Sequence, residues 1–205
     1  MTFRAAFATL HGVKIQTRQA GRRHAGTPFG TPLGRLERRA LRIQLAHFGM
    51  RPEERGRLFY ALELAGETGE LLNGCKKFIR TRHARRRGLQ ARREIPEEAA
   101  DALIALMLLR LAAGDREPVV PRRPATQPPD DPAWLHQCLS RLALDAARLY
   151  DRETRRTGPA FDCACYQRVV EALLAVAARF DFNLESATNT KLSAIVTKVA
   201  RGYYD

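Results

Sequence analysis

The sequence predicts an all-α protein folded as a helical bundle. Apolar residues recur at the three- and four-residue spacing of amphipathic helices through most of the chain, and no segment of any length alternates as a β-strand does. Clusters of Gly and Pro at 49–52, 114–132 and 158–159 separate the helical segments. Because no sheet is expected, the helices must bury their apolar faces against one another, which predicts a bundle.

Composition and charge leave the function open. At 205 residues with 45% hydrophobic side chains, the chain is long enough to bury a core. Lys and Arg outnumber Asp and Glu by 35 to 22, and the net charge of +13 attracts nucleic acids and nucleotides alike. The longest uncharged apolar run, 102–109, is far too short to span a membrane. Four cysteines without a convincing signal peptide indicate a reducing compartment, so we expect a cytoplasmic protein.

The first third of the chain predicts a basic arm and two helices. Residues 1–33 contain scattered Gly and Pro and no acid, and they predict a flexible basic arm ahead of a single helical domain at 34–205. Helical spacing of apolar residues predicts a helix from about 33 to 48. A second helix is expected from Pro52 to about 81, because a proline suits the first turn, where its missing N–H would be unpaired anyway.

The remainder predicts a basic loop, a Pro-rich linker and four more helices. The strongly basic segment 82–93 is expected to form a loop, after which Pro96 opens a helix that ends near Ala113. Apolar residues surround this helix completely, which is typical of a buried central helix. Residues 114–132 hold six prolines and predict a linker. The last three helices are expected at about 133–156, 165–180 and 184–200.

Two pairs of carboxylates stand out on consecutive helices. Glu67 and Glu70 are three residues apart on the second helix, where their Cβ atoms lie roughly 5–6 Å apart. Glu98 and Asp101 repeat this spacing near the start of the next helix. A solvated face would explain the first pair, and the helix dipole favours acids such as Glu98 in the first turn. The helix dipole does not explain Asp101, which lies beyond that turn.

Together the two pairs predict a metal site. Consecutive helices joined by a short connection form an antiparallel hairpin, so the pairs would face each other. No Lys or Arg between Glu94 and Leu109 offers a local partner for these charges, whereas a bound cation would. Four carboxylates make an all-oxygen cage of the kind that binds Mg²⁺ or Mn²⁺. Lys77 follows Glu70 by seven residues on nearly the same face and is a candidate to bind phosphate.

The acidic motifs resemble a known family. ALELAGETGELLNGCKK (61–77) and IPEEAADALIALMLL (95–109) are similar to the two motif helices of the MazG-like all-α nucleoside triphosphate pyrophosphohydrolases, with the pattern E-x-x-E, 27 intervening residues, then E-x-x-D. NLESATNTKLSAIVTKV (183–199) is similar to the family's last helix, in which a lysine reaches the substrate phosphates. The matching residue is Lys191, but Ser193 stands where the family commonly has Asn. The resemblance covers 40–113 and 165–200, with 114–164 as an insertion.

The resemblance implies a reaction and a set of site residues. It implies Mg²⁺-dependent hydrolysis of nucleoside triphosphates, either dNTPs or non-standard NTPs, to a nucleoside monophosphate and pyrophosphate. Both acid pairs would hold the metal, and Lys191 would bind phosphate. His47 and Phe48 would contact the base, unless both are ordinary core residues of the first helix. The family also implies a homodimer or a homotetramer.

Two other interpretations remain open. The chain could be a non-enzymatic helical protein that holds DNA or RNA through its arm and the 82–93 loop, with weak, unspecific and salt-sensitive binding because the loop nearly lacks aromatic residues. A zinc site could instead staple the insertion through His136, Cys138, Cys163 and Cys165. The usual C-x-x-C spacing is absent, and buried free cysteines are the alternative.

Overall fold

The computed structural model describes residues 32–81, 85–115, 119–122, 128–155 and 161–202. These residues form seven α-helices: α1 (Pro32–Phe48), α2 (Pro52–Arg55), α3 (Arg57–Thr81), α4 (Arg85–Ala112), α5 (Pro132–Arg155), α6 (Cys163–Phe180) and α7 (Leu184–Ala200). No strand occurs in this part of the chain. The predicted all-α bundle is therefore confirmed. None of these helices combines the length and the apolar character needed to cross a bilayer.

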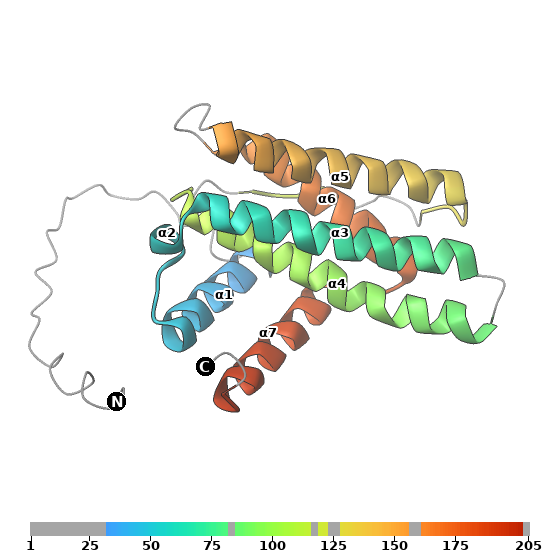
Figure 1. Cartoon of the computed structure of the whole chain (residues 1–205). Coiled ribbons are helices and arrows are strands. Elements are labelled where there is room, and N and C mark those ends of the chain that lie inside the picture. The colour runs from blue at the N-terminus through green and yellow to red at the C-terminus, as the bar shows by residue number, and fades with distance from the viewer. Residues whose placement is uncertain (1–31, 82–84, 116–118, 123–127, 156–160, 203–205) are drawn as a thin grey trace, which may run out of the picture.

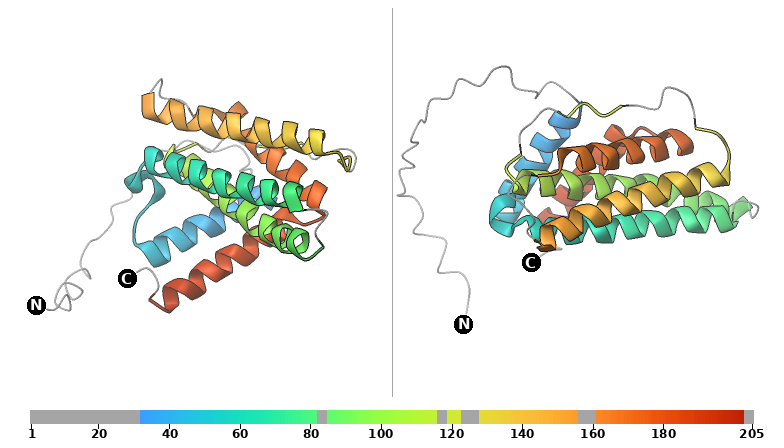
Figure 2. Two further views of the ribbon diagram at one scale, coloured as in Figure 1. Left: turned by 45° about the vertical axis from the view of Figure 1, so that its right-hand side comes forward. Right: turned by 90° about the horizontal axis from the view of Figure 1, so that it is seen from above.

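The bundle is built around the α3–α4 hairpin. Figure 1 shows these two long helices running side by side in opposite directions along the molecule. Helix α5 packs on α3 and on α6, so the segment predicted as an insertion is part of the bundle. Helices α1 and α7 pack against α4 and against each other, and Figure 2 shows both on the same side of the hairpin. Helix α4 is thus in contact with α1, α2, α3, α6 and α7.

Helix α4 is the central helix that the sequence predicts. Its second half carries side chains that are almost fully buried on several faces: Ala99, Ala100, Ala102, Leu103, Leu106, Met107 and Leu109. Burying each large apolar side chain contributes about 1.5–3 kcal/mol, taken as an upper estimate. A charged residue on this helix therefore lies close to a large apolar core, where it needs a partner.

The expected basic loop at 82–93 is wrong for residues 85–93, which form the first turns of α4. Pro96 lies inside this helix instead of opening it. A proline inside a helix costs about 3 kcal/mol because it lacks the N–H and crowds the preceding turn. Tertiary packing offsets this cost, since Ala91 and Ile95 are buried against the hairpin partner. A Cβ at Gly74 of α3 would lie 3.7 Å from Ile95 Cγ1, so the two helices approach closely here.

The expected continuous helix from Pro52 to 81 is also wrong, because the chain breaks at Gly56. Gly56 adopts φ +92°, a conformation that side-chain-bearing residues rarely take, and its N–H donates to Pro52 O at 3.0 Å. The break turns the short α2 away from the axis of α3 (Figure 1). It thereby lets Arg55 face the end of α1, where its guanidinium lies 5.6 Å from the Phe48 ring centroid.

The later helices match the prediction closely. The predicted apolar face of α5 is buried: Leu135, Leu139, Leu142, Ala146 and Leu149. Helix α6 begins two residues earlier than expected because Asp162 caps it, accepting a hydrogen bond from Cys165 N. Asn183 caps α7 in the same way by accepting from Ser186 N.

A buried ionic network joins α1, α4 and α6. Arg110 of α4 is 4% exposed and lies 2.9 Å from Glu37 Oε1 and 2.8 Å from Asp115 Oδ2. The Tyr166 hydroxyl donates to the same Glu37 oxygen at 2.9 Å, and the guanidinium stacks 5.0 Å from the Tyr166 ring centroid. Burial alone would lower the pKa of Arg110, but its hydrogen bond to Asp115 and the charge of Glu37 raise it instead.

Candidate metal centre and adjoining cavity

Three carboxylates from α3 and α4 converge. Glu67, Glu98 and Asp101 each offer one oxygen, and these three atoms lie within 4.8 Å of one another. The i, i+3 spacing places Glu98 and Asp101 on one face of α4, and the antiparallel hairpin turns this face toward Glu67. This is the only group of three or more His, Cys, Asp or Glu ligand atoms close enough to share an ion in the described part of the chain.

Glu70, the fourth predicted ligand, lies beside the triad and outside it. It is exposed, and its charge and hydrogen bonding to Glu98 help to raise the pKa of Glu98. The main cause of that rise is burial. The predicted four-carboxylate arrangement thus takes the form of a triad with Glu70 at its edge.

The triad carries more negative charge than its own helices neutralise. Burial, followed by the charges of Asp101 and Glu70, raises the pKa of Glu67 to about 7. The pKa of Asp101 is also raised, mainly by burial. In the described residues no Lys or Arg forms an ion pair with Glu67. A cation placed among these oxygens would relieve both the repulsion and the loss of hydration.

Lys191 supplies a positive charge to the triad from α7. Its Nζ lies 2.5 Å from Asp101 Oδ2 and 2.7 Å from Glu97 Oε1, and the side chain is only 16% exposed. Burial would lower the pKa of Lys191, but the hydrogen bonds to Asp101 and Glu97 raise it. Asp101 therefore has a charged partner within the protein itself. The partner lies far along the chain, where local reasoning about α4 does not reach.

Contacts with α1 hold α7 in the position that presents Lys191. The guanidinium of Arg39 donates to Asn189 Oδ1 at 2.5 Å and to Ser193 Oγ at 2.6 Å. Leu192 is buried next to Lys191. Ser193, where the family commonly has Asn, thus accepts a hydrogen bond from Arg39 of α1.

A cavity of about 460 Å³ adjoins the triad. It lies among α1, α2, α3, α4 and α7, and Glu67 and Asp101 form part of its wall. Its remaining lining is Ala40, Ile43, Gln44, Phe48, Arg55, Phe59, Tyr60, Glu63, Ile104, Ala105, Leu108, Lys191, Leu192, Ile195 and Lys198. The wall thus combines carboxylates, ammonium groups, aromatic rings and aliphatic side chains in one space.

Of the other predicted site residues, some line the cavity and others do not. Phe48 lines the cavity, whereas its neighbour His47 is exposed and does not. His47 is therefore neither in the core nor in this cavity. Lys77 also lies outside the lining, with Nζ 3.7 Å from Glu94 Oε2. Sequence reasoning missed Gln44, whose signal was a polar side chain on the apolar face formed by Leu36, Ala40 and Ile43.

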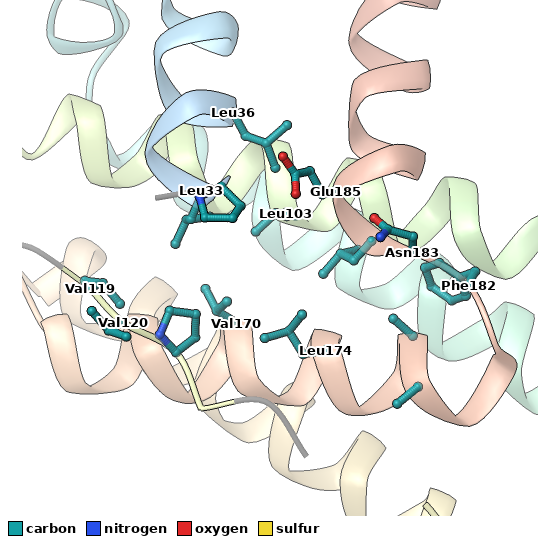
Figure 3. Close-up of a pocket in the computed structure, with 15 residues that line it drawn as sticks. Leu33, Leu36, Leu103, Val119, Val120, Val170, Leu174, Phe182, Asn183 and Glu185 are labelled. Carbon is teal, nitrogen blue, oxygen red and sulfur yellow. The ribbon is translucent and has the colours of Figure 1, made fainter. Parts of the chain in front are cut away.

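A second cavity, of about 420 Å³, is a poor candidate for chemistry (Figure 3). It lies between α1, α6 and the segment 119–121, and aliphatic side chains such as Leu33, Val170 and Leu174 dominate its wall. Its two labelled polar residues already have partners. Asn183 caps α7, and Glu185 forms an ion pair with Arg35 at 3.3 Å.

The four residues of the zinc hypothesis do not come together. His136 is exposed on α5, whereas the Cys138 thiol is buried and donates to Ala172 O at 3.7 Å. Cys165 donates to Asp145 O at 3.2 Å, and burial raises the pKa of its thiol to about 12. Because the thiolate is the form that binds zinc, such thiols are poor ligands. Within the described residues the cysteines form no disulfide, and Cys75, Cys138 and Cys165 are buried.

Comparison of the chain with protein-family models gives no match, and neither curated proteins nor solved structures provide one. The resemblance to MazG-like enzymes therefore rests on the two acidic motifs and the C-terminal helix.

The stability of the protein in EDTA should depend on pH through Glu67. Its folded pKa of about 7 exceeds the ordinary value of 4.5, so between these values the folded state binds more protons than the unfolded state. The free energy of unfolding should therefore fall as pH rises from 4.5 to 7 and level off above. Urea titrations from pH 4.5 to 8 check this. Subtracting the pH dependence measured for Glu67→Gln isolates the contribution of Glu67 to the free energy of unfolding. If the wild type and Glu67→Gln show the same pH dependence, the raised pKa of Glu67 is contradicted.

Proposed function

We propose that this protein is a nucleoside triphosphate pyrophosphohydrolase that uses Mg²⁺, with Mn²⁺ as an alternative ion. One observation carries the proposal: three carboxylates lie within 4.8 Å of one another, and two of them, Glu67 and Asp101, line a cavity that also presents Lys191. The similarity of the two acidic motifs to the MazG-like family supports the same reaction. By that resemblance the substrates are dNTPs or non-standard NTPs.

The residues of the triad fit a hard divalent cation. Carboxylate oxygens are the ligands that Mg²⁺ and Mn²⁺ prefer, and Mg²⁺ commonly uses few protein carboxylates together with substrate phosphates and water. Glu67, Glu98 and Asp101 would bind the ion, and Glu70 at the edge would contribute charge or a further ligand. The raised pKa of Glu67 has its cause in burial and crowded charge, which a bound cation would offset.

Glu67, Glu98 and Asp101 would hold the ion, which would supply charge neutralisation for the triphosphate and activation of a water. In the hydrolysis, water forms a new bond to the α-phosphorus and releases a proton. The bond to the bridging oxygen then breaks, and pyrophosphate leaves with that oxygen. Lys191 stands 2.5 Å from Asp101, so its ammonium would meet a phosphate held by the triad's ion. The cavity next to the triad offers room for the rest of the nucleotide.

Product analysis tests this proposal. The full chain is incubated with each common NTP and dNTP and Mg²⁺ in ¹⁸O-labelled water, and products are followed by phosphorus NMR. We expect nucleoside monophosphate carrying the label, together with pyrophosphate, and no turnover in EDTA. Absence of turnover with both Mg²⁺ and Mn²⁺, or nucleoside diphosphate as the product, would overturn the proposal. Salt-sensitive binding of DNA or RNA without turnover would favour the nucleic-acid-binding alternative.

Two related expectations remain predictions. The basic arm of that alternative lies at 1–33, almost wholly outside the described residues, and part of its expected loop is helical. A homodimer or homotetramer would cover exposed apolar side chains. Leu58 and Leu62, one turn apart on α3, are 51% and 58% exposed.

A further inference from the structure

Two buried polar atoms on the wall of the 460 Å³ cavity, Gln44 Nε2 and the Tyr60 hydroxyl, make no hydrogen bond of normal geometry within the described residues. Gln44 of α1 is 4% exposed, and its Nε2 meets no acceptor among the described residues. Tyr60 of α3 is 2% exposed, and its hydroxyl makes no hydrogen bond of normal geometry with a described residue. Burying such a group without a partner costs about 1–3 kcal/mol, so the missing hydrogen bond of each group needs an explanation.

The surroundings of Gln44 and Tyr60 are aromatic and aliphatic. The Phe59 ring packs edge-on against Tyr60, with ring centroids 5.1 Å apart. The Arg55 guanidinium lies 4.9 Å from the Phe59 ring centroid and 5.6 Å from that of Phe48. Burial raises the pKa of Tyr60 above its ordinary value, although the nearby charge of Arg55 opposes the rise, so the hydroxyl stays protonated and can donate.

We infer that Gln44 and Tyr60 recognise the base of the nucleotide, an inference that rests on the proposed function. A primary amide offers a donor and an acceptor side by side, which matches the donor and acceptor pairs on the edges of nucleobases. Flat rings and a guanidinium plane suit the faces of such a heterocycle. Polar atoms placed among apolar walls are the usual way in which a small-molecule pocket fixes orientation.

The cavity wall offers charged groups that suit phosphates and uncharged polar groups that suit a base. Glu67, Asp101 and Lys191 would attract an ion and phosphates. Gln44 and Tyr60 carry no charge, and an inorganic phosphate would leave their amide and ring contacts unused. The base, not the triphosphate, is therefore the part of the substrate whose binding should depend on Gln44.

Binding measurements with and without a base test the inference. Isothermal titration of the full chain with Mg²⁺ uses α,β-methylene analogues of the four common dNTPs and, as the base-free probe, inorganic tripolyphosphate. Gln44→Met keeps the approximate volume and removes the amide. We expect it to weaken the best-bound analogue roughly 10- to 100-fold, because a hydrogen-bonding site loses its partner, and to change tripolyphosphate affinity by less than about twofold.

The controls separate recognition from structure. Gln137→Met, at an exposed position of α5, should leave every affinity unchanged. The melting temperature of Gln44→Met without ligand should be equal or higher, since an unpaired buried amide is removed. Tyr60→Phe should also weaken binding of the nucleotide analogue but not of tripolyphosphate, and by a smaller factor than Gln44→Met does. A lower melting temperature with parallel losses for both kinds of probe would show a structural role and overturn the inference.

The inference and the proposed function can fail separately. Selective loss of analogue binding in Gln44→Met would uphold base recognition even if no triphosphate is hydrolysed. Equal affinities of the wild type and Gln44→Met for all four analogues would overturn base recognition even if hydrolysis is observed.

Discussion

Glu67→Gln should remove triphosphate hydrolysis while leaving the protein folded and, in EDTA at pH 8, more stable. The carboxamide keeps the size of the side chain but removes a charge from the triad and one carboxylate oxygen from the cation. A loss of the metal site should lower kcat by a factor on the order of 1000. Steady-state kinetics and a thermal melt of the same preparation check both halves of the result.

A matched variant and a metal titration sharpen this test. Glu63→Gln makes the same change one turn earlier on α3, at a residue that lines the cavity but does not belong to the triad. Its kcat should change by less than about tenfold. Mg²⁺ should raise the melting temperature of the wild type and of Glu63→Gln, and raise that of Glu67→Gln less, because only an ion bound to the folded state stabilises it. Near wild-type turnover in Glu67→Gln would remove the basis of the metal assignment.

Arg110→Met should give the largest loss of stability of any single substitution considered. The guanidinium pairs with Glu37 and Asp115 in the interior, where the side chain of Arg110 is 5% exposed. Methionine retains much of the apolar volume but leaves both carboxylates without this partner, and breaking a buried ion pair costs about 3–5 kcal/mol. The free energy of unfolding from urea titration measures the effect.

Two further variants show whether burial causes that loss. Arg155→Met breaks the exposed pair with Asp151 on α5, where both side chains are more than half exposed, and should cost at most about 1 kcal/mol. Arg110→Lys retains the charge without the planar fork, so its loss should lie between the two. Equal losses in Arg110→Met and Arg155→Met would mean that the network contributes no more than a surface pair.

The acidic motifs could be recognised from the sequence because their geometry is local. A spacing of three residues places Glu98 and Asp101 on one face of a helix, whatever the rest of the fold. The short connection between the acidic helices then predicts an antiparallel hairpin, which brings Glu67 to the same place. Glu70 shows the precision of such reasoning. Helical periodicity places it on the same face as Glu67, but the way the two helices cross leaves it at the edge of the triad.

The helix boundaries show where local signals compete with packing. The basic composition of 82–93 and the proline at 96 both favour a loop, yet residues 85–95 are helical. Ala91 and Ile95 gain their burial only when this segment extends alongside α3. Gly56 gives the opposite case. A glycine within a helical pattern can be tolerated or can break the helix, and the packing of α2 against α4 decides which.

What the sequence by itself determined is the all-α class, the order of the main helices and the face on which each acid lies. These follow from the 3.6-residue period of the helix, which relates only near neighbours along the chain. The tertiary structure alone decided that Lys191 pairs with Asp101, that Arg110 is buried with Glu37, and that Gln44 lines the cavity beside the triad. Such pairings join side chains far apart in sequence, and their geometry depends on how whole helices cross and pack.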